Sequence, residues 1–266
     1  MPANDPDTTD PSTGEGTERP RILVPLRVLE GESLPEGVPG LLANAHVVLL
    51  GYHVIPEQTA PGQARMQFED RAIARLDEFE EMLEAAGATV ERRLVFTHEG
   101  QKTIDRLIYE HDCLAVLVPH ATGVVEDVLV PIRGAVGVDR IARIVGGLFG
   151  ESDAVVTLLH VAEDGEEGRD LLDGTRDRLA EFGVEASRVE TRIETDAGPI
   201  DAIVDAAEAF DAIVIGESDP SIATFVFGMT ADQVADRFLG PVFVVQRERP
   251  AENEDPGKNE EADGEG

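Results

Sequence analysis

Two arginines each follow a short apolar run, and this placement is the first feature of the chain that could do chemistry. Arg27 closes residues 21–27 (RILVPLR), and Arg133 closes residues 127–133 (DVLVPIR). A guanidinium at the end of a strand is able to pair with a phosphate group or with a nearby carboxylate. Because acidic residues are abundant, we favour local ion pairs as the interpretation of both arginines.

The remaining reactive side chains form no recognisable catalytic or metal-binding pattern. Neither a nucleophile elbow nor an intact phosphate-binding loop occurs in the sequence. Cys113 opens an apolar run, which predicts a buried structural thiol. His53 and His160 occupy equivalent positions, and His98 and His120 end two strands that could face one cleft. We therefore expect a protein that binds or senses a ligand, with no catalytic residues and no metal site.

The elements that would position these residues repeat along the chain. Similar segments recur in one order at a shift of roughly 100 residues, which is the pattern of an internal repeat. The matching segments are 21–27 with 127–133, 47–54 with 154–161, and 114–119 with 211–216.

Each copy alternates apolar, β-branched runs with amphipathic ones, which is typical of a parallel sheet covered on both faces. The predicted fold class is α/β, a doubly wound five-stranded parallel sheet with helices on both faces, present as two tandem copies. Ligands of such sheets bind beyond the carboxyl ends of the strands. In the second copy we expect strands at 127–133, 154–162, 188–195, 212–217 and 241–247, and helices at 137–150, 166–182, 198–210 and 229–239.

The first copy is shorter than the second. Pro35 and Pro39 make a full helix doubtful in its first crossover, and its fourth helix and fifth strand are missing. We expect a truncated domain over 21–125 and a complete domain over 126–248. The acidic tails at 1–20 and 249–266 contain too few apolar residues to order, so we expect them to be disordered.

Charge is the strongest feature of the composition. The formal net charge is -32, from 54 acidic and 22 basic residues, and lysine occurs only at Lys102 and Lys258. This composition indicates adaptation to the cytoplasm of a halophile, where salt screens repulsion within about 3 Å. It argues against nucleic acid as a partner, because binding to phosphate backbones depends on Lys and Arg. The chain also lacks a signal peptide and a membrane-length apolar run, so we expect a cytoplasmic protein without membrane insertion.

The ordered set of motifs resembles the universal stress protein family over all of 127–247 and, less completely, over 21–120. The set comprises an Ile-Leu-Val-Pro opening, a His-Val end to the second strand, a glycine loop and a final Pro-Val-x-Val-Val strand. The resemblance implies an adenine-nucleotide alpha-hydrolase-like fold and, in one branch of the family, ATP binding. In that branch glycines after the fourth strand let backbone amides approach phosphate oxygens at a helix N-terminus.

The glycine loop of the second copy departs from the pattern of that branch. Gly216 and Gly228 match its outer glycines, but Asp219 replaces the inner one and would repel a polyphosphate. Arg133 stands where the branch usually has Asp. The resemblance therefore implies a regulatory or ligand-sensing protein without an intact ATP motif, or alternatively an ATP- or AMP-binding protein. The nucleotide site would be lined by Pro131, Arg133, Val161, Gly216, Ser218, Gly228 and Thr230. In the first copy, Pro119 and His120 replace the glycine entry.

The resemblance also suggests protein partners. Family members pair their last strand across a dimer, and the first copy here has no fifth strand to offer, so an uncovered edge at 241–247 predicts a homodimer. Similar degenerate domains occur attached to transporters, so a third alternative is an interaction module that regulates a membrane transporter.

Overall fold

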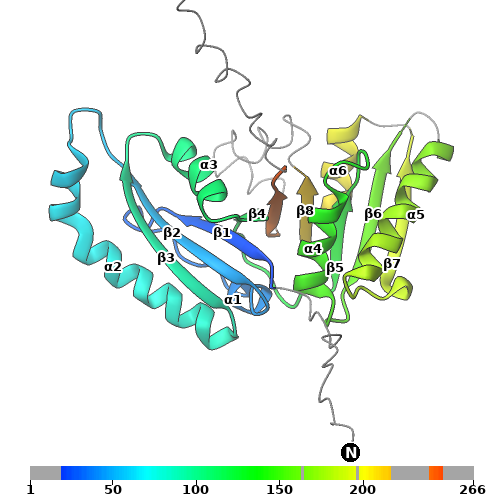
Figure 1. The fold of residues 1–266 in the computed structure, drawn as a ribbon, viewed down its shortest axis with the longest axis horizontal. Helices are drawn as coiled ribbons and strands as arrows, with labels where there is room; N and C mark the ends of the chain where they lie inside the picture. Colours follow the sequence, from blue (N-terminus) through cyan, green and yellow to red (C-terminus); the bar gives the residue numbers. More distant parts are fainter. Residues whose placement is uncertain (1–18, 163–164, 196–197, 217–239, 248–266) are drawn as a thin grey trace, which may run out of the picture.

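The computed structural model describes residues 19–162, 165–195, 198–216 and 240–247 (Figure 1). At its centre lies one nine-stranded sheet with the order β3-β2-β1-β4-β9-β8-β5-β6-β7. Among the described residues, no helix is both long and apolar enough to cross a membrane. The prediction of an α/β fold with a large, mostly parallel sheet is confirmed.

The first half of the chain contributes four parallel strands, in the order β3-β2-β1-β4. They are β1 (Arg21–Leu26), β2 (His46–Val54), β3 (Thr89–Thr97) and β4 (Ala115–Val118). Its helices are α1 (Val38–Leu41), α2 (Pro61–Ala86) and α3 (Gly100–Glu110). The first crossover, with its prolines, contains only the four-residue α1. The long helix α2 begins at Pro61, whose ring suits the first helical turn, and ends at Gly87, whose φ is 111°.

The second half contributes five strands in the matching order β7-β6-β5-β8-β9. They are β5 (Asp127–Pro131), β6 (Val155–Val161), β7 (Val189–Glu194), β8 (Ala212–Gly216) and β9 (Val242–Val245). The helices are α4 (Val138–Phe149), α5 (Gly165–Glu181), α6 (Pro199–Ala207) and the 3-10 turn η1 (Ala186–Arg188). The expected helix at 229–239 and the predicted tails at 1–18 and 248–266 lie outside the described residues. The division into tandem copies at 125/126 stays a prediction.

Helices cover both faces of the sheet because the central strands are apolar on both sides. One face packs against α1, α2, α4 and α5, through residues such as Leu42, Leu76, Ile144 and Leu179. The opposite face packs against α3 in the first half and against α6 in the second. This double winding matches the prediction.

The prediction of an uncovered edge at 241–247 is wrong. Strand β9 pairs in parallel with β8 and antiparallel with β4 of the same chain, with Val244 opposite both Ile215 and Val116. A homodimer that adds a strand to β9 therefore has no free edge to use. Strand pairing is non-local, so β4, which lies far from β9 in the sequence, covers the edge that the sequence predicted to be open.

The antiparallel junction has a geometric consequence for any ligand site. Because β4 runs against β9, the strands of the first half point opposite to those of the second. The carboxyl ends of β1 to β4 therefore lie at one end of the strands, and the carboxyl ends of β5 to β8 lie at the other end. Sites built on the two halves cannot share one cleft.

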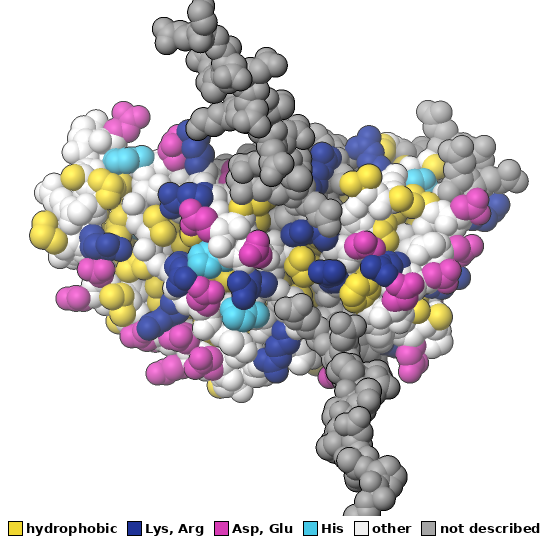
Figure 2. Space-filling view, viewed as in Figure 1, with side chains coloured by type: hydrophobic (Ala, Val, Ile, Leu, Met, Phe, Trp, Pro, Cys, Tyr) yellow, Lys and Arg dark blue, Asp and Glu magenta, His cyan; other side chains and the backbone are white. Residues whose placement is uncertain are grey.

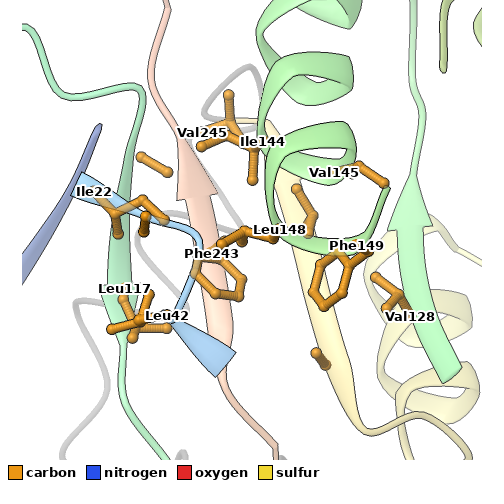
Figure 3. Packing of buried hydrophobic residues seen from close by; sticks show 14 of the residues in the cluster. Ile22, Leu42, Leu117, Val128, Ile144, Val145, Leu148, Phe149, Phe243 and Val245 are labelled. Carbon is orange, nitrogen blue, oxygen red and sulfur yellow. The ribbon is translucent and has the colours of Figure 1, made fainter. Parts of the chain in front are cut away.

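Both halves share one buried core across this junction. Phe243 of β9 is fully buried, with Ile22 and Leu117 on one side and Leu148 and Phe149 of α4 on the other (Figure 3). Helix α4 also fits closely against the chain that enters β1. A Cβ atom added to Gly147 would lie 2.5 Å from Cδ of Pro20. These contacts join the halves through side-chain packing as well as through the β4–β9 ladder.

Candidate ligand-binding site

A pocket lies beyond the carboxyl ends of β5, β6 and β8, at the edge where such sheets bind ligands. It contains about 680 Å³ of space, part of which is open to solvent. Apolar side chains from three strands, α4 and α6 form most of its wall. The lining residues are Pro131, Ile132, Arg133, Gly134, Val136, Ile141, Leu159, Val161, Pro199, Ile203, Ile215 and Gly216.

Four of the predicted site residues meet in this pocket. Pro131 ends β5, Arg133 follows it, Val161 ends β6 and Gly216 ends β8. They come together because the carboxyl ends of neighbouring parallel strands lie at one edge. Ser218, Gly228 and Thr230 lie outside the described residues, so their part in the site stays a prediction.

The helices add walls that the motif comparison did not reveal. Ile141 of α4 is buried, as is Ile203 of α6, and Pro199 opens α6 at the pocket. Val136, in the turn between β5 and α4, is 79% exposed and lies at the rim. The sequence predicted a helix over 198–210, but only the fold shows that Ile203 of this helix borders a pocket.

His160 supports the strand end from which Arg133 extends. Its Nδ1 lies 2.6 Å from the carbonyl oxygen of Ile132, and the side chain is buried. On its other side the ring packs against α5, where a Cβ added to Gly168 would lie 2.7 Å from the ring carbon Cδ2. The imidazole is therefore held between the end of β5 and α5, where it supports the backbone of Ile132.

The corresponding strand end of the first half is filled by the chain itself. Arg27 donates from Nε to the Tyr52 hydroxyl at 3.1 Å, and its Nη1 pairs with Glu30 at 3.3 Å. These contacts raise the pKa of Arg27, the Tyr52 hydrogen bond most strongly. Its backbone N–H donates to Glu32 at 2.6 Å. For Arg27, the interpretation as a local ion pair is confirmed.

The other predicted reactive side chains are placed apart. His98 and His120 follow β3 and β4, which β2 and β1 separate in the sheet, and that the two histidines face one cleft stays a prediction. His98 contacts the carbonyl oxygen of Ile55 instead, with Nδ1 at 3.2 Å. The Cys113 thiol is buried as predicted, and burial raises its pKa to about 12.

Comparisons with known proteins agree with this architecture. The sequence model of the universal stress protein family matches residues 125–246. No curated protein sequence matches the chain significantly. A solved universal stress protein from Archaeoglobus fulgidus DSM 4304 is similar with a TM-score of 0.59 and 19% identity, covering 87% of this chain and 97% of its own.

Two further solved structures cover about half of this chain. One is a universal stress protein in complex with cAMP, with 23% identity, a TM-score of 0.37, and coverage of 46% of this chain and 98% of its own. The other is a universal stress protein from Archaeoglobus fulgidus in complex with dAMP, with 20% identity, a TM-score of 0.36, and coverage of 46% and 99%.

The family match spans β5 to β9 with the pocket at their carboxyl ends, and the Archaeoglobus fold extends over both halves. The resemblance stated from the motifs is thereby confirmed: residues 125–246 match the model of the universal stress protein family, and the fold of the whole chain is similar to that of a universal stress protein.

Proposed function

We propose that this protein is a cytoplasmic, ligand-sensing regulatory protein without enzymatic activity, whose second half binds an adenine nucleotide. The observation that carries the proposal is the pocket beyond β5, β6 and β8, which gathers Pro131, Arg133, Val161 and Gly216. Ligand pockets are mostly apolar with a few polar groups that orient the ligand. The walls formed by Ile132, Leu159 and Ile203 suit a flat base, and Arg133 supplies a positive charge.

AMP is the nucleotide that this site should prefer over ATP. Glu217 and Asp219 follow directly after Gly216 in the sequence. Carboxylates close to a triphosphate repel it, and the repulsion grows with the charge of the ligand. A monophosphate carries less charge than a triphosphate, so this repulsion is smaller.

The first experiment is to purify the protein in multimolar KCl, denature it, and assay the supernatant for released nucleotide. Titration calorimetry with AMP and ATP then measures binding directly. We expect AMP in the supernatant or a heat of binding that saturates. If no nucleotide is released and neither compound gives heat, the proposal fails.

A matched pair of variants locates the site. Val161→Phe places a larger ring at the end of β6 inside the pocket and should abolish AMP binding. Val54→Phe makes the same change at the end of β2, at the opposite edge of the sheet, and should leave it unchanged. Equal effects of the two variants would place the ligand elsewhere.

The alternative of a module that regulates a membrane transporter stays a prediction from the family resemblance. Co-purification of the protein with a permease from a membrane fraction, without bound nucleotide, would favour it over the proposal above.

A further inference from the structure

The loop between the first strand and the next helix differs between the two halves of the chain. In both halves it ends at a glycine with positive φ, which is Gly37 before α1 and Gly137 before α4. The loop spans residues 27–37 in the first half and only residues 132–137 in the second. The two loops also differ in how firmly the rest of the fold holds them.

The loop of the first half is anchored along its length. Val28 and Leu34 are each 5% exposed and belong to the buried core. Near the end of the loop, Thr122 donates its backbone N–H to the carbonyl oxygen of Glu36 at 3.0 Å. A Cβ atom added to Gly37 would lie 2.0 Å from the carbonyl oxygen of Thr122, so these two segments are in direct contact. This loop is therefore part of the packed fold.

Among the described residues, the loop of the second half lacks such anchors at its tip. Gly134, Ala135 and Val136 are all exposed, and Val136 is 79% exposed. A Cβ atom added to Gly134 or to Gly137 would meet no atom within 4 Å. The turn is closed by a hydrogen bond from the backbone N–H of Val138 to the carbonyl oxygen of Ala135 at 3.4 Å, which is longer than usual. A segment with so few contacts opens and closes at a low cost in free energy.

Val136 is exposed beside a cavity that is able to shelter it. It lines the pocket with Gly134, and Ile132 and Ile141 supply apolar wall on either side of the loop. A ligand that fills an apolar pocket removes the side chains at its rim from water, and this burial is favourable. The glycines at 134 and 137 give the loop the backbone freedom to follow such a ligand.

We propose that residues 134–137 form a strap that closes over the ligand in the pocket, with Val136 packed on the base of the adenine nucleotide. The inference rests on the proposed function for the identity of the ligand. Closure of the strap slows the release of the ligand, as lids do at other binding sites. Only the second half has this strap, because the loop of the first half is anchored.

Calorimetry with AMP on the full chain tests the contact between Val136 and the base. Val136→Ser removes the apolar surface without filling the pocket. It should weaken AMP binding about tenfold, since burial of a valine side chain contributes about that factor. Val124→Ser is the matched control, because Val124 is 85% exposed in the segment between β4 and β5, and it should leave AMP binding unchanged.

The variant Val136→Cys tests the closure through the rate at which iodoacetamide alkylates the introduced thiol. The native Cys113 is buried and its pKa is raised to about 12, so its own alkylation is slow. Saturating AMP should remove most of the reactivity of Val136→Cys and leave that of Val124→Cys unchanged. Hydrogen exchange of the amides of residues 134–137 should slow as well, because the backbone of a closed strap is ordered.

Each outcome decides one of the two proposals. If AMP binds Val136→Ser as tightly as the wild type, or leaves the alkylation of Val136→Cys unchanged, the strap is overturned while nucleotide binding stands. If AMP does not bind at all, the nucleotide proposal fails, and the apolar dye anilinonaphthalene sulfonate then tests the strap on its own. Weaker binding of the dye to Val136→Ser, with slower alkylation of Val136→Cys in its presence, would support the strap. No change in either quantity would overturn it.

Discussion

At the scale of single residues, His160 and His53 occupy matching strand positions but make different contacts. His160 is buried and bonded to the Ile132 carbonyl oxygen. His53 packs edge-on against Phe68 and Phe96, and its Nδ1 is buried without a hydrogen-bond partner among the described residues. The histidine supports a strand end beside an open pocket only in the second half.

Helix α5 offers a matched pair of glycines to test this support. Gly174 has open space around its Cβ position, whereas Gly168 meets the His160 ring. Gly174→Ala should therefore stabilise the fold by about 0.5–1 kcal/mol, because alanine loses less entropy in a helix. Gly168→Ala should be less stable than Gly174→Ala and should weaken AMP binding. Urea unfolding measures the stability of the two variants, and calorimetry measures their binding of AMP. Variants that do not differ in either quantity would contradict the role given to His160.

His120 should make stability depend on pH. Burial lowers the pKa of His120 from the value of 6.5 expected in the unfolded chain. At a pH between the lowered pKa of the folded protein and 6.5, the unfolded state binds more protons than the folded state. Stability is therefore lost as the pH falls below 6.5. Between about pH 7.5 and about pH 5.5, the free energy of unfolding should therefore fall more in the wild type than in His120→Gln. Equal losses in urea titrations would show that other groups cause the dependence.

At the scale of secondary-structure elements, the sheet combines a buried central strand with two charged edge strands. β9 lies in the middle, with every residue buried. The edge strand β3 carries Glu91, Arg92 and Arg93, which form ion pairs with neighbouring side chains. The other edge, β7, carries an ion pair between Arg192 and Glu194. Charged edges oppose pairing with further strands.

A charge introduced into β9 should unfold the protein and should not merely separate subunits. Val244 is 1% exposed, between Ile215 and Val116. Val244→Lys would bury an unpaired ammonium at a cost of several kcal/mol, comparable with the whole stability of a domain. Val124→Lys is the control, since Val124 is 85% exposed. Circular dichroism of both variants tests this, and a folded Val244→Lys protein would contradict the pairing of β9 with β4.

At the scale of the whole molecule, net charge opposes the compact state. On the face shown in Figure 2, acidic and basic side chains are interspersed over both halves. Exposed pairs such as Arg178 with Asp139, at 2.6 Å, offset repulsion locally. Over the whole chain, 54 acidic residues outnumber 22 basic ones. Exposed ion pairs contribute little, so they cannot balance this excess.

Removal of salt should therefore destabilise the protein. At about 0.1 M ionic strength the screening length grows to about 10 Å, so carboxylates across the surface repel one another. The urea midpoint should fall as KCl is lowered from multimolar levels to about 0.1 M. Sucrose at equal osmolality is the control, because it does not screen charge. An unchanged or higher midpoint in low salt would contradict the interpretation of the composition.

The sequence predicted most of the elements and part of the site. Within the described residues, apolar runs and amphipathic periodicity located the strands and helices of the second half to within a few residues, because these patterns are local. The motif comparison identified Pro131, Arg133, Val161 and Gly216, which the pocket brings together. The motif comparison missed Ile141 and Pro199, because the residue pattern of a helix does not indicate which cavity the helix borders.

By itself, the sequence determined the α/β class and the arginine at each strand end, and it predicted a repeated order of segments with a shortened first half. Tertiary structure alone decided that β4 pairs with β9 and that the strands of the two halves run in opposite directions. It also decided that Glu32 accepts a hydrogen bond from Arg27, and that Arg133 borders a pocket. The physical reason is the separation along the chain over which each interaction acts. Periodicity and charge act between neighbours along the chain, whereas strand pairing and pocket walls depend on residues that only folding brings together.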